Sequence, residues 1–129
     1  MKVSELTGLA LDWAVAKCEG FKVSRLGHGN KIGVYRIDGE SWYETRKPYN
    51  PSTEWEQGGP IIQREGMELL CNVSPAQAKA FKNANPDWFA CLKYKRADHW
   101  HGPTPLIAAM RCYVASKLGD TVEVPAELI

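Results

Sequence analysis

The sequence lacks the features that mark several large classes of protein. It has no run of about 18 apolar residues, which a membrane-spanning helix requires. Residues 1–6 lack the apolar core of a secretory signal, so we expect a protein of the cytoplasm. Neither sign of charge is in excess, because 16 Lys and Arg stand against 15 Asp and Glu. A general nucleic-acid binder usually carries a strong basic excess, so nucleic acid is not the expected partner.

Closely spaced cysteine pairs are also missing. The four cysteines include no Cys-x-x-Cys pair and are Cys18, Cys71, Cys91 and Cys112. Without an export signal we expect no disulfide framework, and we interpret these cysteines as reduced, buried, small apolar residues. A zinc site assembled with His99 or His101 is the alternative, but the paired ligand spacing of such sites is absent. The sequence therefore predicts no metal and no cofactor.

Catalytic signatures are equally scarce. The chain contains no nucleophile elbow, no phosphate-binding P-loop and no His-Glu-x-x-His sequence. Asp98 and His99 are neighbours, and neighbours on an extended chain point to opposite faces. The alternative is that Glu54 and Glu56 form an acid/base pair, but glutamates in a solvated loop usually contribute only to solubility. We therefore do not expect an enzyme, and an enzyme acting on a nucleotide is the weakest reading.

What is present suffices for a single folded domain over residues 1–129. With 44% apolar residues, the chain is too apolar to stay disordered and can bury roughly two thirds of its unfolded surface. A Leu- and Ala-rich segment predicts a helix at about residues 7–18, with Thr7 as its N-cap. A second helix is predicted at about residues 105–118, with Thr104 as its N-cap.

The rest of the chain predicts short strands. Residues 32–37 and 41–44 are β-prone and flank Asp38-Gly39, which is a hairpin signal. Residues 46–59 look irregular and are a candidate binding loop. The other expected elements are strands at residues 60–63, 67–73, 88–95 and 121–124 and a short helix at about residues 75–83. The expected fold class is α+β, a small antiparallel sheet packed with two main helices.

The segment that leads into the last helix is the first candidate binding site. The first turn of a helix leaves backbone N–H groups free and attracts anions. Thr104 adds a hydroxyl there, Trp100 can stack on a base, and Arg111 can pair with a phosphate two turns later. The alternative is that Thr104 is only a helix cap and Gly102-Pro103 only a turn.

The irregular segment around residues 49–60 is the second candidate. It combines flat aromatic rings and a short hydroxyl with consecutive glycines, which let a backbone approach a ligand closely. An arginine follows shortly after. The candidate residues are Tyr49, Ser52, Trp55, Gly58, Gly59 and Arg64. The alternative is that Asn50-Pro51 is a turn and that Trp55 pins the loop to the core.

The five tryptophans divide into groups by their surroundings. Trp13 and Trp88 fit the core of predicted elements, and the role of Trp42 stays open. Trp55 and Trp100 lie in glycine- and proline-bearing segments beside possible phosphate donors. The last two are therefore the candidates for stacking on a planar ligand.

Several of these segments also carry a family resemblance. The matching motifs lie at residues 5–8, 11–16, 51–55, 57–62, 102–116, 119–120 and 122–125. With them the chain resembles the NinX-like family of small phage and prophage proteins. The resemblance implies a dispensable accessory protein acting in the cytoplasm of an infected bacterium. It brings no activity and no catalytic residue to transfer.

Taken together, the sequence favours a non-catalytic module that binds a phosphate-bearing, nucleotide-like small molecule, with a counter-defence role. A site shared between identical subunits is an open alternative, with contacts through small residues of the last helix: Ala108, Ala109, Cys112 and Ala115. The rival from another class is a protein that binds and inhibits a host protein through exposed aromatic anchors.

Overall fold

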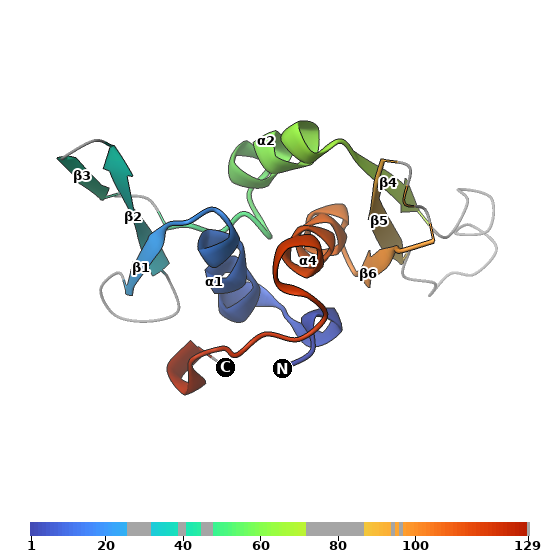
Figure 1. Ribbon diagram of the computed structural model, residues 1–129. Coiled ribbons are helices and arrows are strands. Elements are labelled where there is room, and N and C mark those ends of the chain that lie inside the picture. Colours follow the sequence, from blue (N-terminus) through green and yellow to red (C-terminus); the bar gives the residue numbers. More distant parts are fainter. Residues whose placement is uncertain are drawn as a thin grey trace.

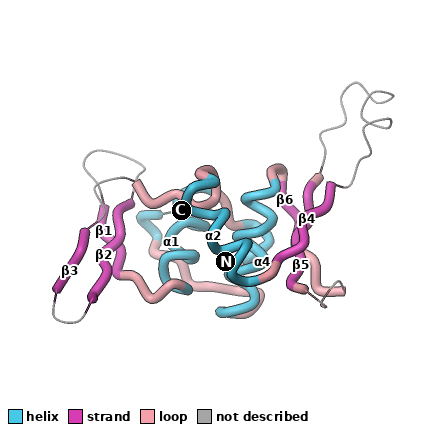
Figure 2. The backbone as a smooth tube through the Cα atoms, turned by 90° about the horizontal axis from the view of Figure 1, so that it is seen from above, coloured by secondary structure: helices cyan, strands magenta, loops and turns pink. Residues whose placement is uncertain are grey.

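The computed structural model describes residues 1–25, 32–38, 41–44, 48–71, 87–93, 95 and 97–128. Three helices of the described chain lie in the middle, with a three-stranded antiparallel sheet on either side (Figures 1 and 2). The helices are α1 (Gly8–Cys18), α2 (Trp55–Glu65) and α4 (Pro105–Leu118), accompanied by the 3-10 turns η1 (Val3–Glu5) and η2 (Ala126–Leu128). The α+β fold class predicted from the sequence is confirmed.

The strands form two sheets rather than the single sheet that the sequence predicts. One sheet contains β1 (Lys22–Arg25), β2 (Ile32–Asp38) and β3 (Ser41–Glu44), and the other contains β4 (Met67–Cys71), β5 (Trp88–Leu92) and β6 (Trp100–Gly102). The predicted hairpin is confirmed in its strands, since β2 and β3 pair antiparallel. The sheets are separate because each covers a different side of the helical layer, the first at α1 and the second at α4.

Helix α4 is the centre of the core. It contacts α1, α2 and all three strands of the second sheet, and residues 108–114 are buried without exception. A helix that is buried on every side needs small residues where its neighbours approach closely. Ala108, Ala109 and Cys112 fill this role and are buried within the chain, so these three residues are not available for the subunit contact that the sequence left as an alternative. Leu118, at the end of α4, is 44% exposed.

Helix α2 is the largest departure from the sequence prediction. The sequence predicts an irregular segment at residues 46–59 and a strand at residues 60–63, and both predictions are wrong over residues 55–63. Gly58-Gly59-Pro60 are poor helix formers. The structure places all three inside the helix, where Pro60 lacks the N–H for one backbone hydrogen bond. Tertiary packing overrides propensity here, since Ile61 and Gly58 are buried and α2 lies against α4. The helix ends at Gly66, whose φ of 65° is the left-handed conformation that glycine adopts readily.

Other predicted elements have mixed outcomes. Strands β4 and β5 confirm the predictions at 67–73 and 88–95, although residues 72, 73 and 94 lie outside the described part of the chain and β5 ends before Lys93. Strand β6 lies in a segment for which the sequence predicts no strand. The predicted edge strand at 121–124 is wrong, because only Thr121 pairs, in an isolated bridge with Lys2. The short helix predicted at about residues 75–83 lies outside the described residues. Two cysteines are not buried as expected: Cys71 is exposed and Cys18 half-buried.

The two ends of the chain lie together (Figure 1). The amide of Val3 donates to Asp120 O over 2.9 Å, and the terminal amine of Met1 donates to Val122 O over 2.8 Å. These contacts hold η1 beneath α4. Among the described helices, none combines the length and the apolar character needed to cross a membrane.

Candidate functional site

Two segments far apart in the sequence meet at one surface hollow, which we call the Trp55 hollow. Residues 52, 53 and 55 line one side, and residues 104–107 at the start of α4 line the other. The volume is about 360 Å³, at the low end of the range of roughly 300–1,000 Å³ for small-molecule pockets. No charged residue is among the described residues that line it. The structure thus brings together three of the predicted site residues, Ser52, Trp55 and Thr104.

Thr104 caps α4 as predicted. Its Oγ1 accepts a hydrogen bond from the amide of Ile107 over 3.1 Å, and Pro105 occupies the first helical turn. The hydroxyl hydrogen of Thr104 is not used by this bond, because the oxygen is the acceptor. A ligand oxygen in the hollow can therefore receive it, next to the partial positive charge at the start of α4.

Trp55 and Ser52 give the hollow its two contrasting surfaces. Trp55 is 53% exposed, so much of its ring faces solvent. Ser52 is 1% exposed, and its hydroxyl has no hydrogen-bond partner of good geometry within the described part of the chain. The hydroxyl still lies close enough to the carboxyl of Asp12 to offset part of the rise in the pKa of that group. A buried hydroxyl without a partner costs roughly 1–3 kcal/mol, and such groups usually have a reason to be retained.

Ser52 is held in place by Asp12, a residue that the sequence analysis did not single out. The amide of Ser52 donates to Asp12 Oδ1 over 2.9 Å, across 40 positions of the sequence. Asp12 lies on α1 and is 4% exposed. The sequence signal was a lone aspartate within an apolar helical stripe, next to Leu11 and Trp13. Burial raises the pKa of Asp12 from 3.8 to about 6, and the contact with Ser52 offsets this only in part.

The raised pKa of Asp12 predicts a pH-dependent stability. A carboxyl that is protonated more readily in the folded state stabilises the fold below its unfolded pKa, and that contribution is lost as the pH rises through about 6. We expect Asp12→Asn to exceed the wild type in free energy of unfolding by about 2 kcal/mol at pH 8 and to match it near pH 4.

Urea denaturation at both pH values checks this expectation. The variant Glu123→Gln, which removes an exposed negative charge, controls for the change in net charge. A constant difference between Asp12→Asn and wild type across this range would contradict the burial effect.

Two predicted aromatic residues lie in other hollows. Tyr49 is half-buried, contacts Phe21 edge-on at 5.7 Å between ring centroids, and lines a hollow of about 550 Å³ together with Asp12. Trp100 lines a hollow of about 610 Å³ beside Lys117 and is half-buried against the core. Neither ring is among the described residues that line the Trp55 hollow.

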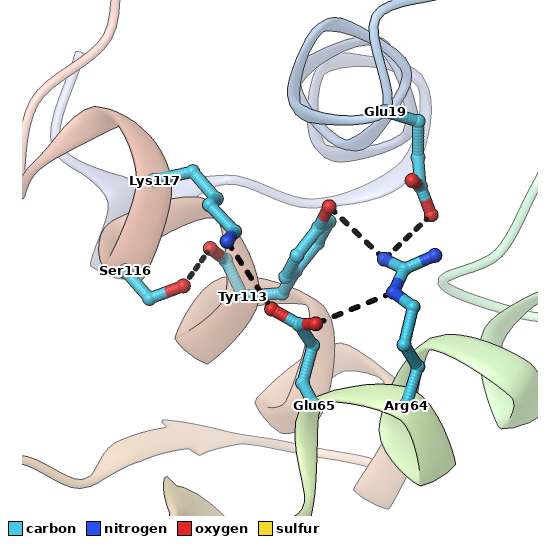
Figure 3. Close-up of polar contacts among 6 residues, drawn as sticks. All are labelled: Glu19, Arg64, Glu65, Tyr113, Ser116 and Lys117. Carbon is cyan, nitrogen blue, oxygen red and sulfur yellow. Dashed lines mark hydrogen bonds and ion pairs between the residues drawn. The ribbon is translucent and has the colours of Figure 1, made fainter.

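Arg64 belongs to a polar network that links the three helices (Figure 3). Its Nη2 lies 3.0 Å from Glu19 Oε1 and donates to the hydroxyl of Tyr113 over 3.1 Å. Its Nε is 3.3 Å from Glu65 Oε2, and Lys117 Nζ is 3.4 Å from the other oxygen of Glu65. Arg64 thus joins α2 to α1 and α4, and it does not line the Trp55 hollow.

Arg111 also serves the fold. It is 8% exposed; its Nε donates to Leu6 O over 2.9 Å and its Nη1 to His101 O over 2.8 Å. The guanidinium predicted to hold a phosphate is therefore bound to two backbone carbonyls, and it is not part of the Trp55 hollow.

The two predicted glycines have different roles. A Cβ on Gly58 would lie 2.5 Å from Pro51 O and 2.7 Å from Leu106 Cδ2, so this glycine permits α2 to approach the start of α4. A Cβ on Gly59 would meet nothing within 4 Å. Gly58 therefore shapes the wall of the hollow from behind rather than contacting a ligand.

Metal ligation finds little support in the described residues. No group of three or more His, Cys, Asp or Glu side chains among them is arranged to hold an ion. His101 Nδ1 lies 2.6 Å from Asp87 Oδ2, and His99 is near His101 with 5.0 Å between ring centroids. Both histidines of the zinc site that the sequence left as an alternative therefore belong to this cluster, which lies at the second sheet.

Comparison with known proteins gives one family. No curated protein matches the chain. A family model described as "Bacteriophage P22, NinX" matches residues 2–117. This range includes both walls of the Trp55 hollow, Asp12 and the whole of α2. Because the match covers most of the chain, the protein belongs to the bacteriophage P22 NinX family.

Proposed function

We propose that this phage protein is a non-catalytic module that holds a phosphate-bearing, nucleotide-like small molecule in the Trp55 hollow. The observation that carries the proposal is that Ser52, whose buried hydroxyl has no hydrogen-bond partner of good geometry, lines one hollow together with the start of α4. Hydroxyl donors and a helix N-terminus are what a phosphate or other anion needs.

The remaining lining fits a planar, partly apolar ligand. Trp55 offers a ring face on which a base can stack, and a base–aromatic stack is worth about 1–3 kcal/mol. Leu106 and Ile107 supply apolar contact on the opposite wall. No carboxylate is among the described lining residues, so none there repels an anion.

This lining supports binding of a ligand rather than its chemical conversion. The described side chains of the hollow include hydroxyls and an indole but no histidine, cysteine or carboxylate to move a proton. In an infected bacterium, a phage protein of this kind would sequester a nucleotide signal of host defence. Two arguments support this role, namely the membership of a phage family and the proposed ligand chemistry of the hollow.

A binding assay on matched variants tests the proposal. We expect a member of a panel of mono-, di- and cyclic nucleotides to raise the melting temperature and to quench tryptophan fluorescence. Trp55→Ala and Ser52→Ala should each weaken binding by about tenfold, since each removes a contact of about 1.4 kcal/mol. Ser52→Ala should fold normally, because it deletes a hydroxyl without a hydrogen bond of good geometry and leaves the bond from the Ser52 amide to Asp12 intact.

Ser116→Ala is the matched control, because Ser116 is an exposed serine on α4 outside the hollow. Its affinity should equal that of the wild type. Mass spectrometry of the ligand released by denaturation should recover it unaltered. An altered product would support the enzymatic alternative, and equal binding by Ser52→Ala and wild type would contradict the assignment of the hollow.

One observation favours a second candidate function. An aromatic ring as exposed as Trp55 beside apolar residues is the usual form of an anchor for a protein partner. Under this alternative a host protein covers the hollow and is inhibited. Trp55→Ala would then abolish co-purification of that protein while Arg64→Ala preserves it, and no nucleotide would shift the melting temperature.

A further inference from the structure

A second hollow, which we call the Asp12 hollow, lies on the other side of Ser52. It has a volume of about 550 Å³ and is lined by the start of α1, by residues 48–50 and 53, and by Glu127 and Leu128 of the C-terminal segment. Thr53 lines both hollows. Asp12 faces this second hollow from α1, while its Oδ1 holds the amide of Ser52.

The described charged side chains that line this hollow are all negative. Asp12 and Glu127 are the charged side chains among its described lining residues, and no Lys or Arg accompanies them there. The start of α1 adds only about half a positive charge, which is less than either carboxylate. Asp12 is 96% buried, since 4% of it is exposed, and no ion pair of Asp12 occurs within the described residues.

A buried carboxylate whose neighbours are only the neutral amide and hydroxyl of Ser52 is incompletely compensated. Removal from water costs several kcal/mol for an ion, and contacts with neutral groups return only part of it. Burial raises the pKa of Asp12 accordingly. A cation placed in the hollow would complete the compensation, and nothing else among the described lining residues can do so.

We propose that the Asp12 hollow binds a small organic ammonium ion, with the carboxylate of Asp12 as its counter-ion. A primary ammonium group has three hydrogens to donate. Besides Asp12, the lining offers the carboxylate of Glu127 and the hydroxyl of Thr7, which makes no capping hydrogen bond to α1. The half-buried ring of Tyr49 and the apolar Leu9 contact the carbon portion of such a ligand.

This proposal does not depend on nucleotide binding, because the carboxylates line the Asp12 hollow and no charged residue is among the described residues that line the Trp55 hollow. Among the described residues, the titratable groups that line the Asp12 hollow with Asp12 are Glu127 and Tyr49. Burial raises the pKa of the Tyr49 phenol, which therefore stays neutral near pH 7. On α4, which packs against α1, Arg111 binds backbone carbonyls and Tyr113 binds Arg64, while β1 contributes the exposed Lys22.

Titration of the full chain with benzylammonium chloride, followed by NMR, tests the proposal. We expect binding at pH 7.5 that weakens about tenfold at pH 5, as protonation of Asp12 removes the counter-ion. Benzyl alcohol, a neutral probe of similar shape, should not bind. Asp12→Asn should lose benzylammonium binding at both pH values and keep nucleotide binding. Its side-chain oxygen can still accept the Ser52 amide, so the variant should fold.

A second variant keeps the test decisive if Asp12→Asn fails to fold. Glu127→Gln should weaken benzylammonium binding about threefold, whereas Glu123→Gln, which lies outside the hollow, should bind as the wild type does. Equal binding of the alcohol and the ammonium ion would overturn the proposal. So would unchanged binding by a folded Asp12→Asn variant, or no binding by the wild type at millimolar probe.

Discussion

Replacement of Arg111 by methionine lowers the free energy of unfolding by about 3–5 kcal/mol, the largest effect that we expect from a single substitution. Methionine preserves the apolar stem but removes both donors, so Leu6 O and His101 O lose their charge-assisted hydrogen bonds. Each such bond is worth about 1.5–3 kcal/mol when the partner group stays buried. The two carbonyls belong to the N-terminal segment and to β6, so the variant should also loosen both from α4.

Arg64→Met is the matched control in urea denaturation. Arg64 has more partners than Arg111, namely Glu19, Glu65 and Tyr113, but its side chain is 50% exposed. Water and salt screen exposed ion pairs, so we expect a loss of less than about 1 kcal/mol. A loss of under about 1 kcal/mol in Arg111→Met as well would contradict the structural role of Arg111 and would reopen its assignment to a phosphate.

A pair of adjacent glycines should respond in opposite directions to the same substitution. Gly58→Ala places a Cβ 2.5 Å from Pro51 O, a backbone atom that cannot move aside cheaply, and lowers the free energy of unfolding by about 2–3 kcal/mol. Gly59→Ala meets no atom within 4 Å and should raise it by about 0.5–1 kcal/mol, because alanine favours the helix.

Thermal or urea denaturation of the two variants gives the comparison directly, because both carry the same change in the same turn of α2. Stabilisation by both alanines would show that α2 does not press against residue 51. Gly58→Ala should also distort the Trp55 hollow, because the new methyl group would meet the side chain of Leu106, which lines the hollow. We therefore expect weaker nucleotide binding in Gly58→Ala and unchanged binding in Gly59→Ala.

Helix α4 shows what the sequence determines locally. Thr104 at the N-cap, Pro105 in the first turn and Gly119 after the end are signals that depend only on nearby residues. The structure has the helix at the predicted bounds, with the predicted cap. Local chemistry is sufficient for such elements, because caps satisfy backbone groups that no distant contact has to supply.

Helix α2 and Asp12 show where local reading fails. The segment Gly58-Gly59-Pro60 disfavours a helix, and only the close approach to Pro51 and Leu106 stabilises one there. The burial of Asp12 depends on Ser52, which lies 40 positions away. Neither contact leaves a periodic signal in the sequence, so the helix was missed and Asp12 was not considered.

The tryptophans illustrate the same limit within the candidate site. Trp55 and Trp100 were grouped together because both lie beside glycine and proline, yet only Trp55 is largely exposed. Trp100 is on β6 and packs against the core, because that strand pairs with β5. The exposure of a side chain depends on sheet pairing and helix packing, and these cannot be predicted from the neighbouring residues in the sequence.

Chemical-shift mapping of the full chain with nucleotides tests the central claim most directly. If the Trp55 hollow holds a phosphate-bearing ligand, the amides of Leu106 and Ile107 and the indole N–H of Trp55 should shift together and saturably. The chemical shift of the Arg64 amide, which lies near the far end of α2, should not change. Shifts confined to residues outside the hollow, or none with any nucleotide at millimolar concentration, would contradict the account.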